Sequence, residues 1–245
     1  MIPAALENAD IETSSEDYAG RFAGPVGAWF LDLQARATVE LLRDFPAGSS
    51  LLDVGGGHAQ LVPALLEAGY RVTVAGSDPA CATRLRPWLD AGRCSFEVGD
   101  LRALPYSQRS FDAVLCFRLL PHSVDWRHLV GQLCRVAERW VMVDYPLSRS
   151  VNIIADRLFS LKRRIERNTR PYTVFRPADI REAFAQNGFR TARERPQFVL
   201  PMVLHRALGA VPVSRSLERV TASLGMRRWL GSPIIARADR VQVAR

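Results

Sequence analysis

The chain of 245 residues, with a mass of 27.3 kDa, is long enough to bury the core of one full domain without disulfides or metal ions. With 48% hydrophobic and 24% charged residues and a mean hydropathy of −0.04, it has the composition of a globular protein, which excludes a disordered or low-complexity chain. It has neither a run of about 18 apolar residues nor the basic start and apolar run of a signal peptide, so a cytoplasmic protein is expected.

The net charge of +8 is distributed unevenly. Residues 1–145 hold 13 basic and 18 acidic residues, a net charge of −5, whereas residues 146–245 hold 20 basic and 7 acidic residues, a net charge of +13. This asymmetry favours different partners for the two parts. The alternative is a bias set by the genome, because 32 of the 33 basic residues are arginine.

Cysteine and histidine spacing gives no sign of a metal centre. The four cysteines lie far apart without a CxxC pair, which favours reduced, mostly buried thiols over a zinc site or disulfides. No two of the four histidines have metal-ligand spacing. We therefore expect no metal.

Helices and strands are predicted to alternate through the first part of the chain. Apolar residues at helical spacing predict a helix over 26–44, which Pro46 and Gly48 end before a short apolar strand at 50–54. A glycine-rich turn and a helix to about residue 67 follow. The other elements predicted up to residue 145 are strands at 70–78, 94–98, 111–117 and 140–145 and helices at 79–92 and 125–137.

Beyond residue 145 this alternation is interrupted. A basic amphipathic helix is predicted over 151–167, and a second helix begins at Pro177 and ends before Gly188. A strand at 189–199, a helical insertion at 202–229 and a strand at 232–239 complete the chain. The pattern predicts an α/β fold: a doubly wound, Rossmann-like, mostly parallel sheet of seven strands with an antiparallel edge strand and helical lid elements.

The unusual residues of the predicted sheet fall at the carboxyl ends of its strands, where such sheets bind ligands. Asp53, Gly55 and Gly57 follow the first strand, Asp78 the second and Asp100 the third. The glycines allow a ligand to approach the backbone closely. A dinucleotide is disfavoured, because Gln60 replaces a fingerprint glycine and Asp53 would repel a pyrophosphate, so a cationic ligand fits better.

These residues resemble the class I S-adenosylmethionine-dependent methyltransferases, in particular their small-molecule, type 11-like branch. Its "LDxGxGxG" motif matches Leu52, Asp53, Gly55 and Gly57, with Ala59 at the third glycine. Asp78 in "VAGSDP" and the stretch "VGDLRALPYSQRSFDAVLCF" continue the resemblance, which covers about residues 50–145. The stretch "CRVAERWVMVDYP" departs from the family, because it lacks the usual "KPGG" turn.

The resemblance implies S-adenosylmethionine as cofactor and one domain over residues 1–245. Residues 1–49 would form an N-terminal helical cap, 50–145 the cofactor-binding core, and 146–245 the lid helix, the last two strands and the insertion. The implied cofactor-binding residues are Asp53, Gly55, Gly57, Phe117, Arg118 and Arg21 at the methionine portion, Asp78 with Pro79 at the ribose, and Asp100 with Leu101 at the adenine.

Several of these residues also have a purely structural interpretation. Asp78 before Pro79 is a plausible helix N-cap, and Asp53 a core carboxylate. Asp100 with Gly99 forms a turn, and Phe117 suits a hydrophobic core.

The acceptor of the methyl group is predicted to bind outside the shared core. His122 is the candidate general base if the acceptor is a hydroxyl, with helix capping or packing as the alternative role. The aromatic candidates favour a small organic acceptor with natural-product, quinone or lipid character; they are Tyr18, Trp29, Tyr145, Tyr172 and Phe175. The basic helix and the apolar stretch 198–204 suggest peripheral contact with an anionic membrane, with an ordinary solvated lid as the alternative.

Three rival functions are weighed against this one. RNA methylation would use the basic segment, but nucleic acid is disfavoured because no RNA-binding module and no "NPPY"-like tetrapeptide is present. A nicotinamide oxidoreductase is disfavoured by Gln60 and Asp53. A cofactor-binding but non-catalytic partner subunit stays open. The sequence predicts neither the acceptor's identity nor the oligomeric state.

Overall fold

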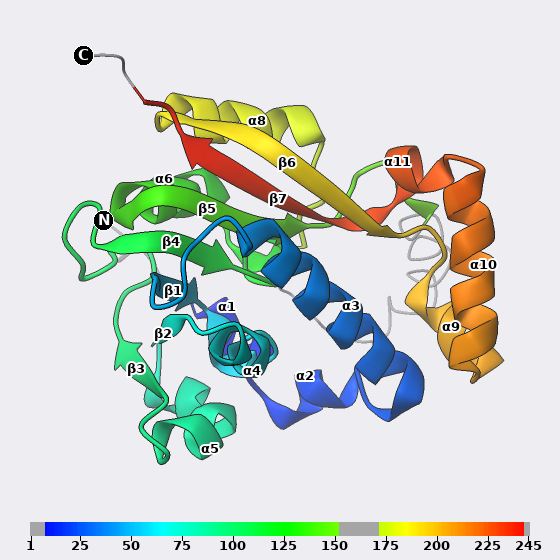
Figure 1. Ribbon diagram of the computed structural model, residues 1–245, viewed down its shortest axis with the longest axis horizontal. Coiled ribbons are helices and arrows are strands. Elements are labelled where there is room, and N and C mark those ends of the chain that lie inside the picture. Colours follow the sequence, from blue (N-terminus) through cyan, green and yellow to red (C-terminus); the bar gives the residue numbers. More distant parts are fainter. Residues whose placement is uncertain (1–7, 152–171, 243–245) are drawn as a thin grey trace.

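The computed structural model describes residues 8–151 and 172–242. Within them the seven predicted strands form one mixed sheet in the order β3-β2-β1-β4-β5-β7-β6 (Figure 1). The first five strands pair in parallel, whereas β7 pairs antiparallel with both β5 and β6. The strands are β1 (Ser50–Val54), β2 (Arg71–Gly76), β3 (Cys94–Val98), β4 (Phe111–Cys116), β5 (Ala137–Tyr145), β6 (Phe189–Phe198) and β7 (Ser232–Arg240).

The prediction of a mostly parallel, doubly wound sheet with antiparallel pairing at one edge is confirmed. The antiparallel strand β7 lies one place in from the edge, which β6 forms. The strand order reverses between β1 and β4, so the carboxyl ends of these two strands border the crevice in which such sheets bind ligands.

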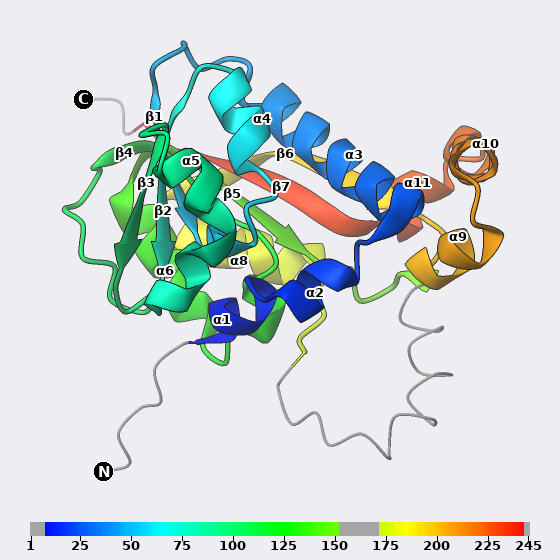
Figure 2. The same ribbon diagram turned by 90° about the horizontal axis from the view of Figure 1, so that it is seen from below.

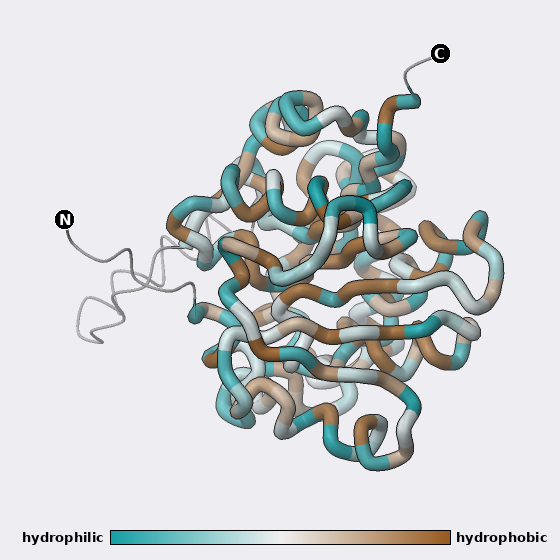
Figure 3. The backbone as a smooth tube through the Cα atoms, turned by 90° about the vertical axis from the view of Figure 1, so that its left-hand side faces the viewer, coloured by the Kyte–Doolittle hydropathy of each residue, from teal (hydrophilic) through white to brown (hydrophobic). Residues whose placement is uncertain are grey.

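Two hydrophobic cores lie on opposite faces of the sheet. Successive strand residues point to opposite faces, so Leu51 packs against α3 (Gly24–Leu42) and α4 (Val62–Glu67), whereas Leu52 belongs to the core shared with α6 (Trp126–Val136) and α8 (Pro177–Gln186). Apolar segments follow the central strands in Figure 3. Because both faces are covered, these strands are apolar almost throughout.

One predicted helix is divided into two. The expected helix over 79–92 forms a 3₁₀ helix at Pro79–Leu85 and a short α-helix, α5, at Arg86–Leu89. Pro87 explains the division, since a proline inside the helix would lack the backbone donor and clash with the preceding turn.

The predicted basic helix over 151–167 lies outside the described residues, apart from Val151. The insertion between β6 and β7 forms α9 (Met202–Leu208), α10 (Val211–Ser223) and α11 (Met226–Leu230), which extend beyond the end of the sheet in Figure 1. At the N-terminus, α1 (Ala9–Thr13) and α2 (Glu16–Gly20) precede α3. In the described part of the chain, no helix is both long enough and apolar enough to cross a membrane.

Candidate functional site

Directly after β1, a strained turn places the backbone over a buried carboxylate. Gly55 has a φ of +74°, and Ala59 takes a φ of +58° where glycine is the usual residue. A Cβ on Gly56 would lie 2.1 Å from Oδ2 of Asp53, so only glycine fits there. The glycine-rich turn therefore encloses the Asp53 side chain.

Asp53 itself is fully buried, and within the described residues neither carboxylate oxygen has a hydrogen-bond partner. Burial, and secondarily the charge of Asp144, raises the pKa of Asp53 to about 7. A buried carboxylate without a partner is unfavourable unless a cation or donor approaches it. Asp53 thus fits the ammonium-bearing portion of S-adenosylmethionine.

The first helix, α1, packs directly on this turn (Figure 2). Asp10 is fully buried, and its carboxylate accepts hydrogen bonds from the backbone N–H of Ser77 at 2.7 Å and from the Ser77 hydroxyl at 2.5 Å. A Cβ on Gly57 would lie 2.3 Å from Oγ of Ser14, just beyond α1. The close approach that the glycines permit is therefore made here by the N-terminal segment of the chain.

At the ends of β2 and β3, the two predicted acidic residues take part in local turns. The Asp78 carboxylate accepts a hydrogen bond from the N–H of Ala80 at 2.8 Å, and that of Asp100 from the N–H of Arg102 at 2.8 Å. Asp78 therefore acts as an N-cap of the 3₁₀ helix and Asp100 forms a local turn, as their structural interpretations predicted. Both side chains remain partly exposed, which leaves them accessible to ligand hydroxyl or amine groups.

The other predicted cofactor residues divide into buried and peripheral ones. Leu101 and Phe117 are fully buried, and Pro79 is exposed at the start of the 3₁₀ helix. The Arg21 guanidinium forms an ion pair with Glu12 at 3.4 Å and is half-exposed. The positive charge of Arg21, a predicted cofactor residue, is therefore paired with the carboxylate of Glu12 in α1.

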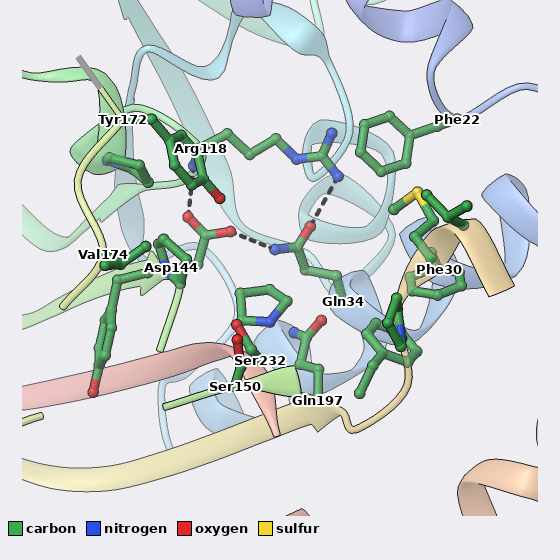
Figure 4. Close-up of a pocket in the computed structure, with 18 of the residues that line it drawn as sticks. Phe22, Phe30, Gln34, Arg118, Asp144, Ser150, Tyr172, Val174, Gln197 and Ser232 are labelled. Carbon is green, nitrogen blue, oxygen red and sulfur yellow. Dashed lines mark hydrogen bonds between the residues drawn. The ribbon is translucent and has the colours of Figure 1, made fainter. Parts of the chain in front are cut away.

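Arg118 joins a buried polar network at the ends of β4 and β5 (Figure 4). Its backbone N–H donates to Asp144 at 2.6 Å, and its guanidinium donates to the amide oxygen of Gln34 at 3.2 Å. The Gln34 amide nitrogen in turn donates to Asp144 at 2.8 Å. Burial lowers the pKa of Arg118 and raises that of Asp144.

Asp144 and Gln34 were not predicted as site residues. The strand-end argument that singled out Asp53 also applies to Asp144, which lies at the carboxyl end of β5. Gln34 gives no such sequence signal, because it lies within the apolar helix α3 and is identified only by its contacts.

This network forms one wall of a cavity of about 300 Å³. The predicted residues Tyr18, His122, Tyr145 and Tyr172 line it, together with apolar side chains from α3, β6 and α9. Two polar atoms at the cavity, Oγ of Ser150 and Nε2 of Gln197, are buried without a hydrogen-bond partner among the described residues; Figure 4 shows both side chains at the same wall as Ser232. The apolar lining residues are Phe22, Phe30, Pro121, Pro146, Val174, Phe198, Leu200, Pro201, Met202, Val203 and Pro233.

Two of the aromatic acceptor candidates lie away from the cavity lining. Trp29 packs edge-on against Phe198, with ring centroids 5.6 Å apart, and borders a separate groove. Phe175 is buried in the core beside Trp126. Trp29 contacts Phe30 and Phe198, and Phe175 contacts Tyr145, so both residues pack against side chains that line the cavity.

Comparisons with known proteins agree with this architecture. A family model described as a methyltransferase domain matches residues 30–194. No curated protein gives a significant match. Eight similar proteins of known structure are 12–17% identical to this chain, and their similarity concerns the fold.

Three similar structures illustrate the range of these relatives. Magnesium protoporphyrin IX methyltransferase (ChlM) from Synechocystis PCC 6803 with bound SAH is 15% identical, with a TM-score of 0.65 over 94% of this chain and 97% of that chain. A chain from the complex of the Haloferax volcanii Trm112 methyltransferase activator with a putative methyltransferase is 16% identical, with a TM-score of 0.66 over 97% and 100%. The [4+2]-cyclase SpnF is 16% identical, with a TM-score of 0.56 over 87% and 80%.

The sheet order, the glycine-rich turn over Asp53 and the family model agree with one another. The chain therefore belongs to the methyltransferase domain family, with the fold of the class I S-adenosylmethionine-dependent methyltransferases.

Proposed function

We propose that this protein transfers a methyl group from S-adenosylmethionine to a small organic acceptor held in the 300 Å³ cavity. The observation that carries the proposal is the buried, unpartnered Asp53 at the end of β1, two strands from Asp144, a residue of the cavity wall whose charge contributes to the raised pKa of Asp53. Cofactor and acceptor sites would thus adjoin at the ends of β1, β4 and β5. Such adjacency is what an in-line displacement at the sulfonium methyl group requires.

Each part of the cofactor has residues of suitable chemistry. Asp53 would face the ammonium, Gly55 and Gly57 would admit the methionine portion, and Asp78 and Asp100 would accept hydrogen bonds from the ribose and adenine. The cofactor supplies an activated methyl group, so the chain itself has to align the acceptor and exclude water. The largely apolar cavity wall serves both purposes.

His122 is the candidate base for a hydroxyl acceptor, since it lines the cavity and its ring lies 5.5 Å from that of Tyr172. Replacing His122 by alanine should then lower kcat for hydroxyl acceptors by about 100-fold or more, the contribution typical of general base catalysis. An unchanged kcat in His122→Ala would leave His122 with a packing role. Cofactor affinity should be unaffected and serves as the internal control.

The direct test of the cofactor site is calorimetric titration with S-adenosylhomocysteine. Asp78→Ser retains an N-cap oxygen for the helix but removes the carboxylate, so it should weaken binding at least tenfold without loss of fold. Asp90→Ala, an exposed carboxylate beyond α5, is the matched control and should bind as the unmodified protein does. Binding of NAD instead, or equal affinity in Asp78→Ser, would contradict the site.

A screen of small acceptors, with release of S-adenosylhomocysteine as the readout, then tests methyl transfer. Turnover that appears only with structured RNA would favour the RNA methyltransferase alternative. Tight cofactor binding without turnover on any acceptor would favour a non-catalytic partner subunit.

A further inference from the structure

The insertion between β6 and β7 exposes an unusual number of large apolar side chains. Of the fourteen large hydrophobic residues exposed in the described part of the chain, seven lie within the 29 residues 202–230. Contiguous exposed apolar surface on a globular protein commonly marks an interaction site. The seven are Val203, Leu204, Leu208, Val213, Val220, Leu224 and Trp229.

Helix α10 turns its apolar stripe away from the protein. Val213, Leu217, Val220 and Leu224 have the i, i+4, i+7, i+11 spacing of a core-facing helix, yet Val213, Val220 and Leu224 are 45%, 55% and 69% exposed. The buried residues of this helix are Ser214, Glu218 and Thr221.

Glu218 fixes this orientation. Its carboxylate accepts hydrogen bonds from the backbone N–H groups of Val199 and Leu200, at 3.1 and 2.9 Å, and lies 3.2 Å from Nε2 of the buried His205. Because two buried polar groups and the partly buried N–H of Leu200 depend on Glu218, rotating α10 to bury its apolar stripe would leave them unsatisfied. The exposed stripe is therefore a stable feature of the fold.

Charge distinguishes among the partners that could cover this surface. Residues 202–230 contain five arginines and a single carboxylate, Glu218, which is buried. A second copy of the same face would bring like charges together. On α10, Arg215 and Arg219 line the groove beside α3, away from the apolar stripe. Arg206 and Arg228 are exposed on α9 and α11, whose exposed apolar side chains include Val203, Leu204 and Trp229. Exposed apolar side chains with arginines beside them fit the interface of an anionic lipid bilayer. The five arginines are Arg206, Arg215, Arg219, Arg227 and Arg228.

The start of α9 adjoins the acceptor cavity. Pro201, Met202 and Val203 line the cavity, and Val203 is also 52% exposed at the start of α9. Leu204 and Leu208 extend this apolar surface along α9. An acceptor leaving a bilayer at α9 would meet apolar side chains up to the cavity.

We propose that the insertion α9–α11 docks on an anionic lipid surface and that the cavity takes a lipid-soluble acceptor from it. The proposed docking depends only on the insertion. The proposal that the acceptor comes from the bilayer also rests on the proposed methyl transfer.

Sedimentation with vesicles tests the docking. The full-length protein should bind phosphatidylcholine vesicles that contain about 30% phosphatidylglycerol, and bind pure phosphatidylcholine at least tenfold more weakly. Arg206→Gln with Arg228→Gln, two exposed arginines of α9 and α11, should reduce binding to the anionic vesicles by more than tenfold, because each arginine near the surface contributes about fivefold. Val220→Ser with Leu224→Ser should reduce binding by about tenfold.

Val124→Ser is the matched control, because Val124 is 81% exposed but lies outside the insertion; its vesicle binding should be unchanged. Absence of binding to anionic vesicles, or equal loss in Val124→Ser, would overturn the docking. So would a dimer, seen by sedimentation velocity, that Val220→Ser with Leu224→Ser converts to monomer, or an acidic protein that competes for the face while vesicles do not bind.

Calorimetry with S-adenosylhomocysteine separates this proposal from the proposed function. The insertion variants should keep the cofactor affinity of the unmodified protein. Vesicle binding without methyl transfer to any acceptor would refute the proposed function and the acceptor's source, and leave the docking confirmed.

Discussion

Replacing Asp53 by asparagine tests the electrostatic state of the carboxylate beneath the glycine-rich turn. The pKa of Asp53 is about 7 in the folded protein, against 3.8 in an unperturbed chain. Between these two values the folded protein retains a proton that the unfolded chain has released. The stability that this protonation contributes is therefore fully present below about pH 4 and is lost as the pH rises to about 7.

The size of the effect follows from the shift of about three pKa units, each equivalent to about 1.4 kcal/mol. The unmodified protein should thus lose about 4 kcal/mol of stability through Asp53 between pH 4 and pH 8, and Asp53→Asn should not. Measuring the change with pH removes the constant penalty of an unsatisfied buried amide, about 1–3 kcal/mol.

Urea unfolding followed by circular dichroism at pH 4, 6 and 8 provides the assay. The difference in unfolding free energy between Asp53→Asn and the unmodified protein should shift by about 4 kcal/mol in favour of the variant across this range. Asp90→Asn, at an exposed carboxylate, should show no such shift. Parallel pH profiles for Asp53→Asn and the unmodified protein would refute the reasoning. The variant should also bind S-adenosylhomocysteine at least tenfold more weakly, because it lacks the charge that we propose faces the ammonium.

Three further substitutions test the surroundings of the site. Asp10→Ala removes the carboxylate that fastens α1 to Ser77, so S-adenosylhomocysteine should bind about tenfold more tightly by calorimetry; unchanged affinity would mean that α1 does not compete with the cofactor. Gly57→Ala places a Cβ 2.3 Å from Oγ of Ser14, and urea unfolding should show a loss of about 1–3 kcal/mol. Glu218→Ala leaves buried donors unpaired and should lower the unfolding free energy by about 3–5 kcal/mol; a loss below 1 kcal/mol would argue against the fixed orientation of α10.

Local sequence patterns were sufficient where a structural element depends on its own residues. Short apolar runs predicted the central strands β1, β2, β4 and β5 within a few residues of their observed bounds, because a strand buried on both faces needs nearly continuous apolar sequence. The edge strands β3 and β6 are largely exposed and more polar, and their predicted bounds are also within a few residues of those observed. The prediction of one continuous helix over 79–92 was wrong, because Pro87 divides it, and this proline was visible in the sequence. The acidic residues at strand ends are likewise visible in the sequence, and Asp144, at the carboxyl end of β5, follows the same rule.

The sequence by itself was enough to predict a doubly wound, mostly parallel sheet and a glycine-rich turn after β1, since these follow from periodicity and turn chemistry. The cationic ligand expected at Asp53 is a prediction from charge alone. Only the tertiary structure decided that α1 covers the turn, that Gln34 meets Asp144 across 110 residues of chain, and that α10 turns its apolar stripe outward. Such contacts depend on how packing rotates each helix and which segments the sheet brings together. No local pattern encodes that choice, because in α10 a buried carboxylate outweighs the amphipathic period.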